Sequence, residues 1–261
     1  MARVVLCATL AAPEECSLNS EFQIAWSEML DSGFQVQAVI FDLDGLILDS
    51  ERCYFRCWQR AAADVGFELS ESRYGDLVGI PNDRAEMLLA ERMGKAFPLA
   101  DFRIRWNGYW DELLRCEEIP VKPGVLELLE LLDARSIPRA IASSSFERDV
   151  VASLGRWLER FPVIVSRDMV ANGKPAPDLF LAAAQRLGVA PQYCLALEDS
   201  DVGIRAAVAA GMPVILVPDI NQPSPEAVAA AWRVCSSLHE AIPIIEILLS
   251  ADSLPDSSYG V

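Results

Sequence analysis

The sequence contains a single histidine, His239, and none of its seven cysteines is paired with another at the C-x-x-C spacing. The sequence therefore offers few residues for a histidine-based catalytic triad or for a zinc site. The odd number of cysteines and their scatter over 261 residues fit reduced thiols better than a disulfide framework. We therefore expect a cytoplasmic protein whose chemistry depends on residues other than histidine and cysteine.

Basic residues and long apolar runs are also scarce. Lys and Arg number 22 against 38 Asp and Glu, and the formal net charge of −16 argues against a nucleic-acid backbone or an anionic membrane as partner. No apolar run reaches the ~18 residues that a membrane span needs. The start is a poor signal peptide, because its apolar stretch is short and acidic residues follow at once. We expect a monomer or weak dimer with neither nucleic acid nor membrane as partner.

Hydrophobic residues make up 52% of the chain, and in its second half they alternate between helical and strand patterns. Short apolar runs, as expected for buried parallel strands, occur at 38–42, 138–143, 161–166, 193–199 and 212–218. Helical patterns lie between the later runs. This alternation predicts an α/β fold with a parallel sheet and helices on both of its faces.

Between the first and second predicted strands the alternation stops, and only helical patterns occur until the linker “IPVKPG”. We interpret this block as a helical cap inserted into the sheet domain. The expected division is an N-terminal extension at 1–36, a core at 37–54 and 120–250, a cap at 55–119 and a C-terminal tail at 251–261.

Two carboxylates end the first predicted strand. At positions i and i+2 of an extended chain, Asp42 and Asp44 point the same way, and Gly45 lets the backbone turn out of the strand. Ligands of open parallel sheets bind at this carboxyl edge. Because two neighbouring carboxylates repel, one is protonated or a cation lies between them, and Mg²⁺ suits such ligands. Asp49 and Glu51 are interpreted as favourable charges, and Ser50 as the N-cap, of the helix that follows.

Complementary groups follow three later segments. Glu198 and Asp199 end another predicted strand and would supply further metal oxygens. Ser143–Ser145 offer hydroxyls and backbone N–H groups to phosphate oxygens, and Lys174 offers a point charge from a turn. Each motif alone has a simple structural explanation, as a strand-end turn, a solvated lysine or a charge before a helix. Together they predict a phosphoryl-transfer site.

In such a site Asp42 attacks phosphorus and forms an acyl phosphate. Asp44 protonates the leaving alkoxide and then activates a water molecule. Mg²⁺, Lys174 and Ser143 stabilise charge on the transferring oxygens.

Four stretches occur in the order “FDLDGLILDSE”, “IASSS”, “GKPAPDLF” and “LEDSDVGI”. They resemble the four motifs of the haloacid dehalogenase-like hydrolases, in particular the branch with a helical cap that includes β-phosphoglucomutase and many sugar-phosphate phosphatases. The resemblance covers about residues 37–250 and implies a Rossmann-like core. It also implies these roles: nucleophile Asp42, acid/base Asp44, phosphate-binding Ser143, bridging cation Lys174, and Mg²⁺ ligands Asp42, Glu198, Asp199 and the main-chain oxygen of Asp44.

Three functions could use these residues: a Mg²⁺-dependent phosphatase of a small phosphorylated metabolite, a phosphomutase, and a phospho-acceptor switch. Switch modules are shorter and need no lid. β-Phosphoglucomutase-like enzymes carry a histidine where Tyr54 stands and a basic residue where Val78 stands, so the phosphatase is favoured. A lid implies a small substrate, such as a sugar phosphate. The expected substrate-binding residues are Gly45, Ser144 and Ser145 in the core and Gly79, Asn82 and Arg84 in the cap.

Overall fold

A computed structural model describes residues 35–78, 80 and 82–249 of the chain. The predicted N-terminal extension, apart from its last two residues, lies outside the described residues, as do the predicted C-terminal tail and Gly79. Within the described residues, no helix is both long enough and apolar enough to cross a bilayer.

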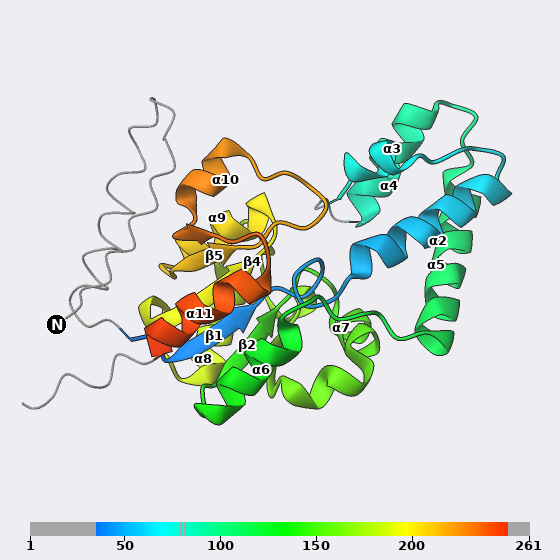
Figure 1. The fold of residues 1–261 in the computed structure, drawn as a ribbon. Helices are drawn as coiled ribbons and strands as arrows, with labels where there is room; N and C mark the ends of the chain where they lie inside the picture. The colour runs from blue at the N-terminus through cyan, green and yellow to red at the C-terminus, as the bar shows by residue number, and fades with distance from the viewer. Residues whose placement is uncertain (1–34, 79, 81, 250–261) are drawn as a thin grey trace, which may run out of the picture.

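Six parallel strands form one sheet in the order β3-β2-β1-β4-β5-β6 (Figure 1). The strands are β1 Ala38–Phe41, β2 Arg139–Ala142, β3 Val163–Val165, β4 Cys194–Glu198, β5 Val214–Leu216 and β6 Arg233–Val234. Val39 pairs with Arg139 on one side and with Leu195 on the other. The strand that precedes Asp42 therefore lies inside the sheet, and the predicted α/β fold with a parallel sheet is confirmed.

Helices cover both faces of the sheet, as the alternation of side chains along β1 requires. Val39 and Phe41 belong to the apolar core on one face, and Ala38 and Ile40 to the core on the other. The first face carries α6 (Val125–Ala134), α7 (Glu147–Leu154) and α11 (Leu238–Leu249), and the second carries α8 (Asp178–Leu187), α9 (Asp201–Ala209) and α10 (Pro225–Ala230). Both faces of the central strand are thus fully buried, which explains its uninterrupted apolar sequence.

Four helices follow β1 in succession: α2 Ser50–Asp64, α3 Glu71–Gly75, α4 Asn82–Met93 and α5 Leu99–Cys116. Figure 1 shows them gathered on one side of the sheet, and we call residues 50–116 the helical block. Helices α2 and α5 pack through aromatic rings, with the Tyr54 ring stacked on that of Trp110 at a centroid distance of 4.0 Å. The predicted boundary between 54 and 55 falls inside α2, which is continuous from Ser50.

The two connections between the sheet and the helical block lie side by side. Leu48 forms an antiparallel bridge with Val121, and the backbone N–H of Asp49 donates to the carbonyl of Pro120 over 2.8 Å. The outgoing and returning chains therefore support one another next to the carboxyl end of β1.

Candidate active site

Side chains from three separate segments meet at the carboxyl edge of the sheet. Asp42 follows β1, Glu198 is the last residue of β4, and Lys174 lies in the turn before α8. The ammonium group of Lys174 forms an ion pair with Oδ1 of Asp42 and lies 2.5 Å from Oε1 of Glu198. The Lys174 side chain is only 2% exposed, so it is not a solvated surface lysine.

The carboxylates of Asp42, Glu198 and Asp199 each place an oxygen within 4.8 Å of the others. Oε2 of Glu198 also accepts from the Ser200 hydroxyl at 3.0 Å and from the backbone N–H of Asp199 at 3.2 Å. Both oxygens of Glu198 thus have protein donors, whereas no donor from the described part of the chain reaches the Asp199 side chain. Asp199 is therefore the member of the cluster with the most freedom to bind a cation.

The electrostatics of this cluster favour a bound cation. Burial raises the pKa of Asp42 to about 8, and the charges of Glu198 and Asp44 add to this, while Lys174 opposes it. Burial and the charges of Asp42 and Glu198 hold the pKa of Asp199 well above its usual range. Burial alone would lower the pKa of Lys174, but its two carboxylate partners outweigh this and raise it. Three carboxylates face one ammonium group, so a divalent cation fits the remaining negative charge.

Asp44 has a different environment from that of Asp42. Its Oδ1 accepts from the hydroxyl of Ser50 at 2.7 Å, and its Oδ2 accepts from the hydroxyl of Ser145 at 2.8 Å. The prediction that Ser50 caps the following helix is therefore wrong: α2 begins at Ser50, and the Ser50 hydroxyl binds the catalytic candidate instead. Two hydroxyl donors fix the Asp44 carboxylate two residues beyond Asp42.

The serine loop after β2 reaches the same edge. Ser143 is fully buried, and its hydroxyl oxygen accepts from the backbone N–H of Ser145 at 3.0 Å. Ser145 turns its own hydroxyl to Asp44, and Ser144 is exposed. Ser145 therefore contacts the predicted site directly, whereas no described contact joins the side chain of Ser143 or Ser144 to its acidic residues.

The family model described as haloacid dehalogenase-like hydrolase matches residues 36–211. The chain belongs to this family. A phosphorylated carbohydrates phosphatase of Thermotoga maritima is 34% identical over 179 residues, which are 68% of this chain and 82% of that protein. The predictions of the family, of its Rossmann-like fold and of a hydrolase are therefore confirmed.

Two solved structures have the same fold as this hydrolase. A mutant of CbbY from Rhodobacter sphaeroides, in complex with xylulose-1,5-bisphosphate, has a TM-score of 0.66 and 28% identity, over 79% of this chain and 96% of that one. The β-phosphoglucomutase of Clostridium difficile has a TM-score of 0.66 and 25% identity, over 81% of this chain and 97% of that one.

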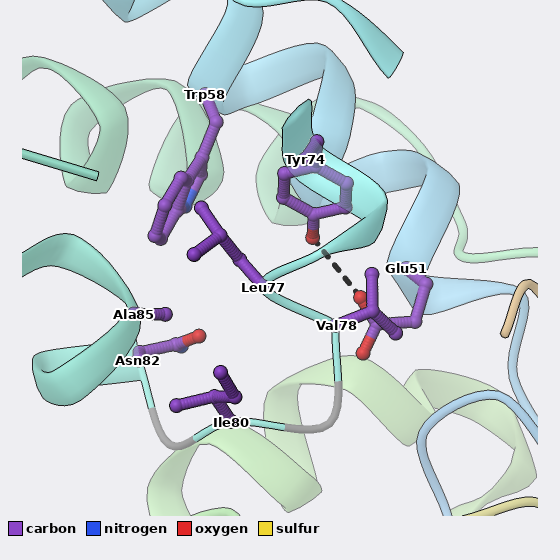
Figure 2. Close-up of a pocket in the computed structure, with 8 residues that line it drawn as sticks. All are labelled: Glu51, Trp58, Tyr74, Leu77, Val78, Ile80, Asn82 and Ala85. Carbon is purple, nitrogen blue, oxygen red and sulfur yellow. Dashed lines mark hydrogen bonds between the residues drawn. The ribbon is translucent and has the colours of Figure 1, made fainter. Parts of the chain in front are cut away.

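A small pocket of the hydrolase lies where the start of α2 faces α3 and α4, as Figure 2 shows. Its lining residues are Glu51, Trp58, Tyr74, Leu77, Val78, Ile80, Asn82 and Ala85. The Tyr74 hydroxyl donates to Oε2 of Glu51 at 3.0 Å. Burial raises the pKa of Glu51 to about 7, with the charge of Asp44 adding to the shift. Glu51 was predicted only to favour the helix N-terminus by its charge. It also lines this pocket, and its carboxyl group interacts electrostatically with Asp44.

The residues of the helical block that were predicted to bind substrate are distributed unevenly. Asn82 lines the Glu51 pocket, whereas Arg84 is exposed and is not one of the described residues that line it. Asp49, also expected to favour the helix N-terminus, makes no cap hydrogen bond and pairs with Arg52 at 2.5 Å. Of the described residues of this segment that were predicted to bind substrate, the pocket therefore includes Asn82 and not Arg84.

Asp219, in the loop after β5, is a buried carboxylate that the sequence analysis missed. Its side chain is 4% exposed, and Oδ1 forms an ion pair with Lys122. The signal was available, because Asp219 follows an apolar strand run just as Asp42 and Glu198 do. The loop places it beside Gly45: a Cβ built on Gly45 would lie 3.5 Å from Oδ2 of Asp219.

Two glycines make room for the carboxylates of the hydrolase. Gly45 has a φ of +84°, and a Cβ there would lie 2.2 Å from Oδ2 of Asp199. Gly203 lies in the first turn of α9, and a Cβ there would lie 1.9 Å from Cδ of Glu198. The Glu198 carboxylate therefore packs directly against the backbone of α9.

We expect Gly203→Ala to destabilise the fold, because the new methyl group would overlap the buried Glu198 carboxylate. Overpacking of this kind costs about 1–3 kcal/mol in the free energy of unfolding, which urea titration measures. Gly108→Ala is the matched control: Gly108 is also helical, in α5, and nothing lies within 4 Å of its added Cβ. That control should be neutral or stabilising by up to about 1 kcal/mol. Equal unfolding free energies for the two variants would contradict the overlap.

Proposed function

We propose that this hydrolase is a Mg²⁺-dependent phosphatase that cleaves a small phosphomonoester, of the sugar-phosphate class, through an aspartyl-phosphate intermediate. The observation that carries the proposal is the buried Asp42 carboxylate at the end of β1, paired with Lys174 and within 4.8 Å of Glu198 and Asp199. The relative named for phosphatase activity on phosphorylated carbohydrates supports the substrate class.

The proposed reaction has two steps that use Asp42 and Asp44 in different roles. An oxygen of Asp42 attacks phosphorus, and the bond from phosphorus to the ester oxygen breaks while Asp44 gives that oxygen a proton. Asp44 then takes a proton from water, which attacks phosphorus and breaks its bond to Asp42. Inorganic phosphate leaves, and both carboxyl groups return to their starting states. Lys174 stays beside Asp42 and stabilises the negative charge that gathers on the phosphoryl oxygens.

In this proposal Mg²⁺ would be held by Asp42, Glu198, Asp199 and the main-chain oxygen of Asp44. Besides acting as a ligand, Glu198 holds Lys174 in place and so positions the ammonium group. When bound, the cation offsets the negative charge of the carboxylates and of the phosphate oxygens. Ser143, Ser144 and Ser145, with Gly45, are the proposed phosphate-side residues of the core.

The helical block is proposed to act as the predicted cap over the site. The Glu51 pocket, to which Asn82 contributes, would receive the part of the substrate remote from phosphorus. Gly79 and Arg84 remain proposed substrate-binding residues of the same segment. A cytoplasmic monomer or weak dimer is proposed with it, and the five cysteines of the described residues, all of them free, support the cytoplasmic location.

A phosphomutase is the second candidate, favoured by the similarity to the solved β-phosphoglucomutase. The residue aligned with the mutase histidine is Tyr54, whose ring is buried and stacked on Trp110 rather than presented as a base. Val78 stands where such mutases have a basic residue and lines the Glu51 pocket. The pocket is therefore poorly suited to a bisphosphorylated intermediate, and the phosphatase is preferred.

The test is phosphate release from a panel of sugar phosphates and other small phosphomonoesters, with Mg²⁺ and after its removal by a chelator. We expect chelation to lower release by about 10²-fold and added Mg²⁺ to restore it, because the carboxylate cluster then regains its counter-charge. Release that is indifferent to the metal would overturn the proposal. Interconversion of hexose 1- and 6-phosphates without phosphate release would replace it with the mutase.

A further inference from the structure

Asp219 is a buried acid with one satisfied and one unsatisfied oxygen. Oδ1 is paired with Lys122 and lies 3.5 Å from the guanidinium of Arg52. Oδ2 is buried and has no hydrogen-bond partner among the described residues. A buried carboxylate oxygen without a donor is rare in native proteins and points to a water molecule or ion at that place.

The unsatisfied oxygen lies near the acidic cluster. A Cβ built on Gly45 would lie 2.2 Å from Oδ2 of Asp199 and 3.5 Å from Oδ2 of Asp219, so both oxygens lie close to one point. Neither of them has a donor within the described chain. The buried Oδ2 of Asp219 lacks a donor, and a water molecule bound to a cation at Asp199 would supply one.

The other side of Asp219 is tied to the connection that returns from the helical block. Lys122 is one residue beyond Val121, which pairs with Leu48 of the outgoing connection. In the same loop, the side-chain amide of Asn221 donates to the carbonyl of Val78, next to the Glu51 pocket, at 3.1 Å. Oδ1 of Asp219 and the loop that carries it therefore have fixed partners, which leaves Oδ2 as the free acceptor near Asp199.

We propose that Asp219 is a positioning residue of the metal site: its Oδ2 accepts a hydrogen bond from a water molecule bound to the cation, and Lys122 holds it in that orientation. The inference rests on the proposed Mg²⁺-dependent function and adds a carboxylate that the four motifs do not contain. Residues that contact a metal through another group commonly change metal affinity by about 10–100-fold when replaced.

The test is calorimetric titration of Mg²⁺ into the full-length, substrate-free protein. In Asp219→Asn, the side-chain oxygen would accept from Lys122, and the amide NH₂ group would point at the metal-bound water. Both of these groups are hydrogen-bond donors, so the hydrogen bond to the water would be lost. We expect the dissociation constant for Mg²⁺ to rise about 10-fold. The rise in the thermal midpoint that saturating Mg²⁺ gives the wild type should shrink in parallel, since binding to the folded state produces it.

Asp49→Asn is the matched control, because it removes one carboxylate charge that shares the Arg52 partner without facing the cluster. Its Mg²⁺ affinity should equal that of the wild type. The double variant Asp219→Leu/Lys122→Met removes both oxygens of Asp219 together with the half-buried lysine that pairs with it, so no lysine is left unpaired. It should still bind Mg²⁺ about 10-fold more weakly than the wild type.

Three results would overturn the inference. Wild-type affinity in Asp219→Asn and in the double variant would show that Asp219 is only an ion-pair partner of Lys122. Equal weakening in Asp219→Asn and Asp49→Asn would show a general charge effect. Both of these leave the phosphatase proposal standing. If the wild type binds no Mg²⁺ and releases phosphate without it, the metal part of the proposed function fails together with the inference.

Discussion

Asp42→Asn should release phosphate at least about 10⁴-fold more slowly than the wild type, the scale seen when a catalytic nucleophile is removed. An amide oxygen is a far weaker nucleophile than a carboxylate, so no acyl phosphate would form. Asparagine has nearly the same shape, and Lys174 keeps Glu198 as its partner, so the fold should survive. Phosphate release under saturating substrate and Mg²⁺ measures the effect, and thermal unfolding checks the fold.

Asp49→Asn is again the matched control for this loss of one carboxylate. Asp49 lies in the segment that follows β1, but its side chain pairs with Arg52 and not with the site. Its phosphate release should stay close to that of the wild type. If Asp42→Asn keeps more than about one hundredth of wild-type turnover, well above the remainder expected after loss of a nucleophile, Asp42 does not form the covalent intermediate.

Asp44→Asn should lower the turnover of alkyl phosphomonoesters by about 10³-fold, within the range for loss of general acid–base catalysis. An amide neither protonates a departing alkoxide nor takes a proton from water. The effect is expected at Asp44 because hydroxyls of Ser50 and Ser145 fix its carboxylate separately from that of Asp42. Steady-state phosphate release from a sugar phosphate measures it.

An aryl phosphate would separate the two roles of Asp44. p-Nitrophenolate leaves without being protonated, so the aspartyl phosphate should still form quickly in Asp44→Asn and then hydrolyse slowly. Rapid mixing should show a burst of about one nitrophenolate per enzyme molecule, which is the mark of an accumulating covalent intermediate. A variant without a burst, and with equal losses on aryl and alkyl substrates, would contradict these roles.

The sequence predicted the sheet and the meeting of acidic residues at its carboxyl edge because both depend on local patterns. The apolar run of β1 reads as a strand buried on both faces, and Asp42 and Glu198 stand where such strands end. Parallel strands bring their carboxyl ends to one edge, so the meeting of these two acids follows from topology alone. Lys174 was identified by its motif, and its burial could not be read from the turn that carries it.

The parts that the sequence did not predict depend on tertiary contacts. Pro243 lies inside α11 and has no N–H for the helix, so local propensity opposes this element. The helix is stabilised nonetheless, because its buried face packs on the sheet core. The residues of this face are Leu238, Ala241, Ile245 and Leu248. Likewise, Ser50 is a good capping residue by type, and only the position of Asp44 decides that its hydroxyl is used elsewhere.

The paired connections at Leu48–Val121 and Asp49–Pro120 bear on how such a protein can change over evolution. With respect to the sheet, the helical block is a loop whose two ends are already held together by these contacts. The entropy of closing a loop grows only slowly with its length, so a longer, shorter or unrelated insert would cost the sheet little free energy. This point of the chain is therefore where one inserted block can be exchanged for another, while Asp42 and Lys174 stay in place.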